Sequence, residues 1–338
     1  MPMSKRALIL GISGQDGSYL ARHLLRHDYD VHGTSRRPGA EASANLARLG
    51  IAGSAQIHEL DLADPAAIRT VLSEIGPSEV YQLSGQSSVG ASFEDPAGTF
   101  QSIAINTTNL LESLRTVTPD ARLFLAGSSE CFGPTDELAG IETGFRPASP
   151  YAAAKASAHL CGVVYRKSFN LFVSNGVMFN HESPLRPDHF VTRKIVSAAA
   201  RISLGSSECL PLGDLTVRRD WGWAPEFVEA MWLMLQHNTP GDFILATGET
   251  RSLEAFVDAV FGCLNLDWRD HVVSDPKLWR SSELGQSLAD IEETGRVLGW
   301  RAEVKMTELA ERLVRHELDA ADQSGGAKSA TGPAVMMS

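Results

Sequence analysis

Short apolar runs alternate with longer segments of mixed polarity through the first half of the chain. Runs of this length predict buried strands, and the segments between them predict helices, for example residues 18–25. Alternation of this kind is typical of an α/β fold with a doubly wound parallel sheet. The predicted strands are residues 7–10, 31–35, 58–62, 79–85, 122–126, 171–178 and 242–246.

Two stretches break this alternation and predict a second, smaller unit. Residues 180–220 are rich in polar and basic side chains, and residues 250–320 end in an amphipathic segment near 306–318. We expect them to form one discontinuous substrate-binding lobe beside a larger domain made of residues 1–179 and 221–249. The Gly/Ser/Ala-rich residues 321–338 lack periodicity and predict a disordered tail.

Composition limits the classes of protein that fit. The 338 residues are 43% hydrophobic and 21% charged, which is typical of a globular protein. A net charge of −11 argues against nucleic-acid binding, and no apolar run approaches the roughly 20 residues of a membrane span. The scattered cysteines predict a reducing, cytoplasmic setting, and His181, Glu182 and His189 lack the spacing of a metal site, so none is expected.

A GxxGxxG pattern, Gly11, Gly14 and Gly17, joins the first strand to the first helix. Glycines permit a tight turn and let backbone N–H groups approach a pyrophosphate at the helix N-terminus. The pattern predicts a Rossmann-type dinucleotide site, with a simple glycine turn as the alternative.

The second predicted strand ends in Ser35, Arg36 and Arg37. NAD-binding folds usually place an acidic residue here to hold the ribose 2′-hydroxyl. Two guanidinium groups suit a 2′-phosphate instead, which predicts NADP over NAD. A solvated pair of arginines is the alternative interpretation.

Four side chains predict the catalytic chemistry. Tyr151 and Lys155 are spaced four apart on a helix that Pro150 opens, so their side chains share one face. A neighbouring ammonium lowers the pKa of a phenol and makes it a candidate base, although an alanine-rich helix can carry such a pair by chance. Ser128 and Glu130 follow the fifth strand, at the edge where α/β sheets bind ligands, and we expect all four to converge there.

Several longer stretches make the chain resemble the GDP-mannose 4,6-dehydratase family of the extended short-chain dehydrogenase/reductase superfamily. They run in order and reach about residue 315. The most discriminating are FNHESPLRP (179–187) and FVTRKI (190–195). The others are GISGQDGSYLARHLL (11–25), VHGTSRR (31–37), SFEDP (92–96), GSSECFG (127–133), SPYAAAK (149–155), RRDWG (218–222) and EAMWLMLQ (229–236).

The resemblance implies conversion of GDP-D-mannose to GDP-4-dehydro-6-deoxy-D-mannose and water, by internal hydride transfer with NADP. It implies Tyr151 as the base at C4, Ser128 as its hydrogen-bond partner, Glu130 as the acid and base at C5 and C6, and Lys155 as the support for the phenolate. The implied cofactor contacts are Gly11, Ser13, Gly14, Gln15, Asp16, Gly17, Arg36, Arg37, Asp61, Leu62, Leu83, Ser84, Gln86, Tyr151, Lys155 and His181. The implied substrate contacts are Ser87, Asn180, Glu182, Lys194, Arg219, Arg280 and Glu283.

The resemblance also implies a homotetramer, a dimer of dimers, in which the polar loop 37–49 reaches the neighbouring subunit's cofactor; a mobile surface loop is the alternative. Departures from the family pattern, at Ala148 and at Ser84-Gly85, leave the exact hexose open. The alternatives are a 4,6-dehydratase of another GDP-linked hexose or heptose, an epimerase or 4-ketoreductase of the same fold, and a non-enzymatic NADP sensor.

Overall fold

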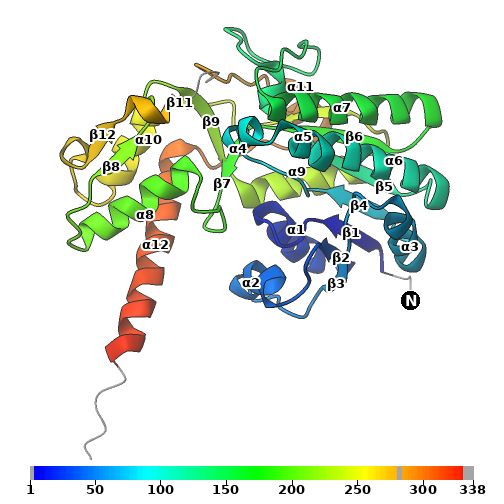
Figure 1. The fold of residues 1–338 in the computed structure, drawn as a ribbon, viewed down its shortest axis with the longest axis horizontal. Coiled ribbons are helices and arrows are strands. Elements are labelled where there is room, and N and C mark those ends of the chain that lie inside the picture. Colours follow the sequence, from blue (N-terminus) through cyan, green and yellow to red (C-terminus); the bar gives the residue numbers. More distant parts are fainter. Residues whose placement is uncertain (1–3, 280–283, 330–338) are drawn as a thin grey trace, which may run out of the picture.

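The computed structural model describes residues 4–279 and 284–329. A seven-stranded parallel sheet forms the centre of the larger domain, in the order β10-β6-β5-β4-β1-β2-β3 (Figure 1). Its strands are β1 (Arg6–Leu10), β2 (Asp30–Ser35), β3 (Gln56–Glu59), β4 (Glu79–Gln82), β5 (Arg122–Ala126), β6 (Val173–Met178) and β10 (Asp242–Leu245). The strand order reverses direction between β1 and β4, which is where doubly wound sheets bind ligands. The predicted Rossmann-type fold is confirmed.

Helices cover both faces of this sheet because successive side chains of each strand point to opposite faces. Ile9 faces the core under α1 (Gln15–Leu25) and α9 (Ala224–Gln236), together with the fully buried Tyr81 and Phe124. Leu8 and Leu10 face the core on the other side. The helices on that side are α3 (Pro65–Ile75), α6 (Asn106–Val117) and α7 (Pro150–Phe169); α4 (Val89–Glu94), α5 (Pro96–Phe100) and a π-helical turn (Gln101–Ile105) lead into α6.

The smaller lobe has a core of its own. A three-stranded sheet contains β7 (Asn180–Glu182), β9 (Arg218–Trp223) and β11 (Thr250–Ser252), and β8 (Leu210–Leu212) pairs with β12 (Val272–Ser274). The helices α8 (Val191–Ser203), α10 (Leu253–Gly262) and α12 (Met306–Ser329) pack around the lobe's core, and α12 then runs out of the body of the molecule (Figure 1).

Several observed boundaries differ from the predicted ones. The third strand ends at Glu59, before Asp61, and residues 40–48 of the expected loop form the helix α2 (Ala40–Arg48). The strand β9 crosses the expected domain boundary at 220/221, and α11 (Glu292–Leu298), expected in the lobe, packs beside β10 because Thr294 Oγ1 donates to the Ile244 carbonyl. The last helix reaches Ser329, beyond the predicted start of the tail, and residues 330–338 lie outside the described chain.

Candidate active site

The turn between β1 and α1 is shaped by two glycines that no other residue could replace without movement. Gly11 has φ +89°, a conformation that L side chains rarely adopt. A Cβ on Gly17 would lie 2.2 Å from the Gly11 carbonyl oxygen. No side chain caps α1, whose N-cap is Gly14, so its first N–H groups remain available to an anion. This turn fits the pyrophosphate of a dinucleotide.

Parallel pairing brings the ends of three strands to the same edge. Leu10 pairs with Thr34 of β2 and with Gln82 of β4. The residues that follow these strands therefore lie around the glycine turn, and they include several of the predicted cofactor contacts. Ser13 contributes its carbonyl to Asn45 Nδ2 at 2.9 Å, which holds α2 against the turn. Leu83, Ser84 and Gln86 follow β4, and Leu83 N–H donates to the Leu10 carbonyl at 3.0 Å.

Arg36 and Arg37 stand exposed just past the end of β2. Ser35 Oγ bonds both the N–H and the carbonyl of Arg37, at 3.2 and 3.1 Å, which fixes the bend of the backbone here. Asp61 is exposed two residues beyond β3, where its carboxylate accepts from Ala63 N–H, while Leu62 is buried. The exposed guanidinium groups suit a phosphate on the adenosine side of the site.

Gln15 and Asp16 are joined to the strand that enters the lobe. Asp16 Oδ2 lies 3.0 Å from His181 Nε2, and Gln15 Nε2 donates to the His181 carbonyl at 3.2 Å. Despite its burial, the Asp16 carboxyl has a pKa lowered to about 2, because the His181 ring and neighbouring donors favour its charged form. The cofactor turn and the start of the lobe are thus held together by buried polar contacts.

Ser128, Glu130 and Tyr151 converge at the carboxyl end of β5. Ser128 caps the 3₁₀ turn Ser129–Phe132, accepting from Glu130 N–H at 3.3 Å, and Ser149 caps α7, which starts one residue before Tyr151. Burial raises the pKa of Tyr151 well above its ordinary value, with a smaller rise from the nearby Glu130 charge, while a Ser128 hydrogen bond lowers it. Glu130 itself is partly exposed.

Lys155 lies at the carboxyl end of β5. Its Nζ donates to the Ala126 carbonyl at 2.8 Å and lies 6.0 Å from the centre of the Tyr151 ring. Burial lowers the pKa of Lys155 to about 8. Burial dominates the pKa of Tyr151, and Arg186 supplies a positive charge that opposes the rise.

Arg186 is a site residue that the sequence analysis did not assign. It belongs to the FNHESPLRP stretch, its Nε lies 3.2 Å from Glu182 Oε2, and its guanidinium stacks 3.6 Å from the centre of the Phe190 ring. Its charge lowers the pKa of both Tyr151 and Asp16. Its place in the FNHESPLRP stretch is the sequence signal that could have pointed to it.

The expected substrate contacts divide into groups. Asn180 and Ser87 are at least partly accessible near the site, and Lys194 is exposed on α8. Arg219 is buried, with Nη1 donating to the Leu284 carbonyl at 2.7 Å. Glu182 is buried too, and accepts from Thr192 Oγ1 at 2.7 Å, so it anchors the lobe. Arg280 and Glu283 lie outside the described residues.

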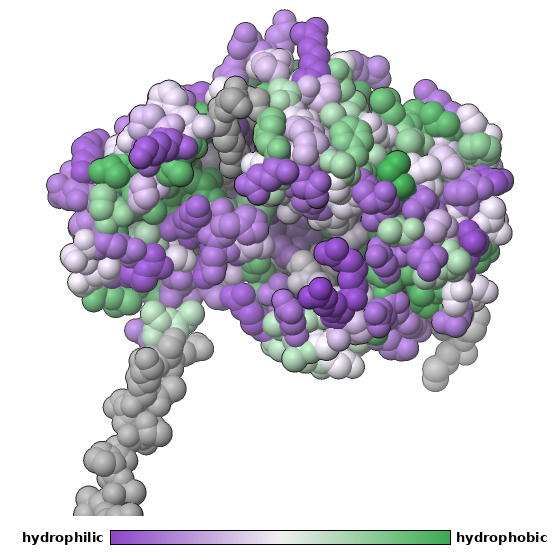
Figure 2. Space-filling model, viewed as in Figure 1, coloured by the Kyte–Doolittle hydropathy of each residue, from purple (hydrophilic) through white to green (hydrophobic). Residues whose placement is uncertain are grey.

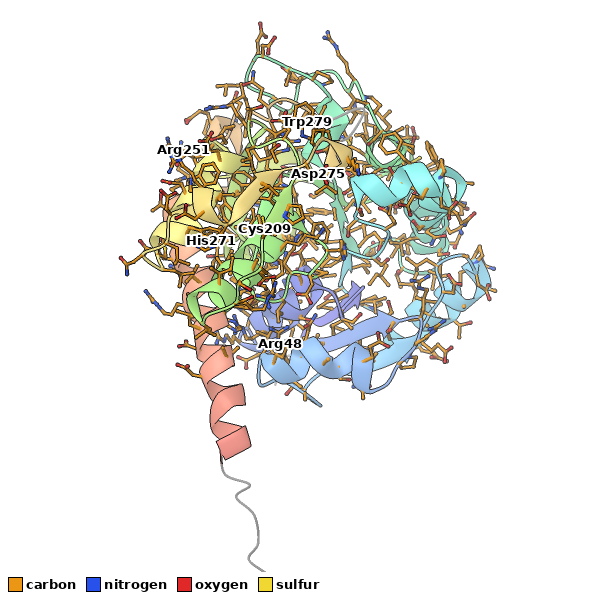
Figure 3. The ribbon with its side chains drawn as sticks, turned by 60° about the vertical axis from the view of Figure 1, so that its left-hand side comes forward. Arg48, Cys209, Arg251, His271, Asp275 and Trp279 are labelled. Atoms are coloured by element: carbon orange, nitrogen blue, oxygen red, sulfur yellow. The ribbon has the colours of Figure 1, made fainter. Side chains whose placement is uncertain are left out.

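The surface is hollowed between the lobe and the larger domain, and hydrophilic residues gather at this hollow (Figure 2). Arg48, at the end of α2, lies on the boundary between the two parts and donates to the Pro184 carbonyl at 3.1 Å (Figure 3). Within residues 4–279 and 284–329, no cluster of His, Cys, Asp and Glu could hold a metal ion, and no helix there is long and apolar enough to cross a membrane.

Solved structures with this fold include a dTDP-glucose 4,6-dehydratase, DesIV, from Streptomyces venezuelae with NAD and TYD bound. It has a TM-score of 0.83 and 22% identity, over 94% of this chain and 98% of that one. RMD from Pseudomonas aeruginosa, complexed with NADPH, has a TM-score of 0.78 and 21% identity, over 94% of this chain and 100% of that one. At these identities the likeness establishes the fold.

Sequence relatives define the family. "GDP-mannose 4,6 dehydratase 2" of Arabidopsis thaliana is 42% identical over 94% of this chain and 88% of its own length. The human GDP-mannose 4,6 dehydratase is 38% identical over 93% of this chain and 91% of its own. The family profile described as GDP-mannose 4,6 dehydratase matches residues 8–313. Since both the profile and these relatives span nearly the whole chain, this protein belongs to the GDP-mannose 4,6-dehydratase family.

Proposed function

We propose that this protein converts GDP-D-mannose to GDP-4-dehydro-6-deoxy-D-mannose and water, with NADP regenerated in each turnover. The observation that carries the proposal is the convergence of Ser128, Glu130 and Tyr151 at the carboxyl end of β5, in a chain matched by the family along nearly its whole length. Glu130 separates this reaction from its alternatives, because an epimerase or a ketoreductase needs no carboxylate at that place.

The chain's own residues fit the cofactor. The glycine turn and the uncapped start of α1 would hold the pyrophosphate, and Lys155 the nicotinamide ribose. Arg36 and Arg37 would hold a 2′-phosphate, which favours NADP over NAD. When bound, NADP would supply reversible hydride transfer, from C4 first and to C6 last.

The proton transfers balance within the site. Tyr151 accepts the proton of the C4 hydroxyl, with Ser128 bonded to the phenol. Glu130 takes the proton from C5 and delivers it to the C6 oxygen, which leaves as water. The carbon at C5 then needs one proton, and Tyr151 holds one. No external acid or base is consumed, so the site is complete with one phenol and one carboxylate.

The nucleotide end of the substrate would lie toward the lobe. Arg219 offers a guanidinium on β9, and Asn180 begins β7 beside it, since Asn180 pairs with Trp221. Guanidinium groups bind phosphate oxygens in a bidentate manner, which suits the diphosphate of a GDP-sugar. Lys194, Ser87, Arg280 and Glu283 complete the proposed substrate set, and Glu182 would act by positioning the lobe.

We also propose that the enzyme works in the cytoplasm as a homotetramer, a dimer of dimers. The outward side of α7 exposes Leu160 and Val164 to 56% and 51%, and Ile105 nearby to 48%. Neighbouring exposed apolar side chains on packed helices suit the same face of a second copy. Light scattering of the wild type and of Leu160→Arg tests this surface, and a mass unchanged by the substitution would count against it.

The activity is tested by mass spectrometry of the purified protein with GDP-, UDP-, CDP- and dTDP-sugars. We expect the loss of one water from GDP-mannose, without consumption of added NADPH, and no product from Tyr151→Phe. Loss of water from a different GDP-sugar would support the runner-up substrate. Retention of the C6 oxygen or consumption of NADPH would indicate an epimerase or a reductase instead.

A further inference from the structure

A small cavity lies behind Lys155, between the central sheet and the helices α6 and α7. Its volume of about 10 Å³ is room for about one water molecule. Polar side chains from β4 and the loop after it, α6, α7 and β6 reach it: Gln82, Ser84, Thr107, Lys155, His159 and Asn175. Such a site is polar enough to hold a water, which a dry apolar cavity is not.

Two of these side chains have buried atoms without a protein partner, Asn175 Oδ1 and His159 Nδ1. Asn175 Nδ2 donates to Asp242 Oδ1 at 2.7 Å, which fixes the amide so that Oδ1 is a free acceptor. His159 Nε2 lies 3.6 Å from Asp242 Oδ2, so the ring hydrogen belongs on Nε2 and Nδ1 is an acceptor as well. Two residues that line the cavity therefore each have a buried acceptor that needs a donor.

Lys155 has donors to spare. An ammonium carries three N–H groups, and Nζ gives one of them to the Ala126 carbonyl. A water that accepts from Lys155 and donates to His159 and Asn175 satisfies all three groups at once. We propose that His159 and Asn175 hold one buried water against Lys155, and that this water keeps the ammonium charged and in place.

The other groups that face Lys155 do not supply this contact. Asp16 from α1 acts on it only through its charge, the buried Cys131 thiol after β5 has a pKa raised to about 12 and is neutral, and Tyr151 lies one helical turn away on α7. Asp242 behind His159 is engaged by Arg166 through two bonds of 2.8 Å. Burial lowers the pKa of Lys155 to about 8, and acceptors at the water favour its charged form. His159 thus acts through Lys155, as a positioning residue.

A water that holds the Lys155 ammonium deepens the proposed function, and it rests on that function because Lys155 is proposed as the positive charge beside the base Tyr151. Two variants of His159 separate the loss of the hydrogen-bond acceptor from the loss of side-chain packing. His159→Phe keeps the edge contact with Phe145, whose ring centre lies 4.9 Å away, but removes the acceptor. His159→Gln keeps an amide oxygen that can accept from the water.

The test is NMR titration of the full-length protein labelled with ¹³C at lysine Cε, with the Lys155 signal assigned from its loss in Lys155→Arg. We expect the midpoint in His159→Phe to fall by about one pH unit, the loss of one hydrogen bond to a charged group. In His159→Gln it should stay within a few tenths of a unit of the wild type. The control is Ser157→Ala on the same helix, whose hydroxyl bonds the Ala153 carbonyl.

Turnover with GDP-mannose separates this inference from the activity. The alkaline limb of the rate profile should move down in His159→Phe together with the lysine midpoint. If even the wild type releases no water from GDP-mannose, the proposed function fails while the titration still tests the water site. A Lys155 midpoint in folded His159→Phe equal to that of the wild type would overturn the inference, whatever the turnover.

Discussion

His181 Nε2 lies 3.0 Å from Asp16 Oδ2, while the other ring nitrogen of His181 lies 2.7 Å from the Phe179 carbonyl oxygen. Neither acceptor carries a hydrogen, so both contacts are satisfied only when the ring is protonated. The Asp16 charge accordingly raises the pKa of His181 despite the opposing effect of burial. The pair joins the glycine turn to β7, and hence the cofactor side of the site to the lobe.

The pair predicts that the free energy of unfolding falls both at high pH, through His181, and at low pH, through Asp16. For His181, whose folded pKa is raised above 6.5, the contribution is full below 6.5 and is lost as pH rises through the folded value. For Asp16, with a folded pKa of about 2 against 3.8, it is full above 3.8 and is lost as pH falls through about 2. His181→Phe should therefore cost about 3–5 kcal/mol of unfolding free energy near pH 6. Urea unfolding at several pH values measures this, and the cost should shrink in alkali.

The matched control is His189→Phe. His189 is exposed and its ring centre lies 4.3 Å from that of Phe190, with the rings tilted, so the same substitution removes an imidazole that has no buried partner. We expect its effect to stay within about 0.5 kcal/mol at every pH. His181 also stacks on Phe227, with the ring centres 4.6 Å apart. A cost for His181→Phe that does not change with pH would show that this packing, and not the charge, holds the turn to the lobe.

Tyr151→Phe and Glu130→Gln should each lower kcat by about 10²–10⁴, the usual contribution of a positioned acid or base. Phe fills nearly the same buried volume and Gln the same partly exposed place, so the melting temperature should move little. The measurement is GDP-mannose turnover beside a thermal unfolding curve. Near-normal turnover in either folded variant contradicts its proposed role.

The fold and the meeting of the catalytic groups could be predicted because both follow from local patterns. The short apolar runs predicted the strands of the central sheet. Parallel pairing of those strands places Gly11, Ser84 and Ser128 at one edge. The family, too, is confirmed from its motifs. The burial of Tyr151 and the approach of Arg186, which both act on the Tyr151 pKa, could not be predicted, because they depend on packing between segments distant in sequence. The support of the phenolate by Lys155 stays a prediction.

Other differences have a similar physical origin. The segment 37–49 was expected to be a loop because it is polar, yet Ala42 and Leu46 are buried against the body and Asn45 bonds Ser13, which stabilises a helix. Glu182 looked like a substrate contact, but its carboxylate is used by Thr192 and Arg186. Spacing alone cannot tell a buried anchor from a ligand contact when both lie in one motif.

Arg36→Ala should weaken NADP binding by about 10–100-fold, the loss of a charged hydrogen bond to the 2′-phosphate, and leave NAD binding nearly unchanged. Titration calorimetry with both nucleotides measures the two affinities. Arg26→Ala is the control, since it removes the same charge from an exposed site at the far end of α1. Equal weakening of NADP and NAD by Arg36→Ala would argue against a phosphate contact.

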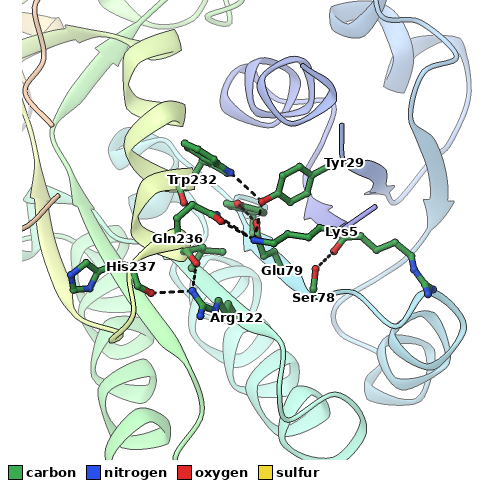
Figure 4. Close-up of polar contacts among 11 residues, drawn as sticks. Lys5, Tyr29, Ser78, Glu79, Arg122, Trp232, Gln236 and His237 are labelled. Carbon is green, nitrogen blue, oxygen red and sulfur yellow. Dashed lines mark hydrogen bonds and ion pairs between the residues drawn. The ribbon is translucent and has the colours of Figure 1, made fainter. Parts of the chain in front are cut away.

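Glu79 and Lys5 should contribute very differently to stability, although they form an ion pair at 3.1 Å (Figure 4). Glu79 is 1% exposed, and its carboxylate accepts from the Tyr29 hydroxyl at 3.0 Å and from the Tyr81 hydroxyl at 2.8 Å. It also accepts from Gln236 at the end of α9. These bonds join the start of β4 to the start of β2 and to α9. Glu79→Leu leaves the buried Tyr81 hydroxyl without its acceptor and should lower the free energy of unfolding by about 3–5 kcal/mol.

Lys5→Met should cost no more than about 1 kcal/mol, because the lysine side chain is 54% exposed and water replaces its partner. Urea unfolding of the two variants measures the contrast. Glu79 lies at the amino end of β4, opposite the catalytic edge, so turnover of folded Glu79→Leu should stay close to the wild type. Similar losses of stability in both variants would mean that the ion pair, and not the buried phenols, accounts for the energy of this network.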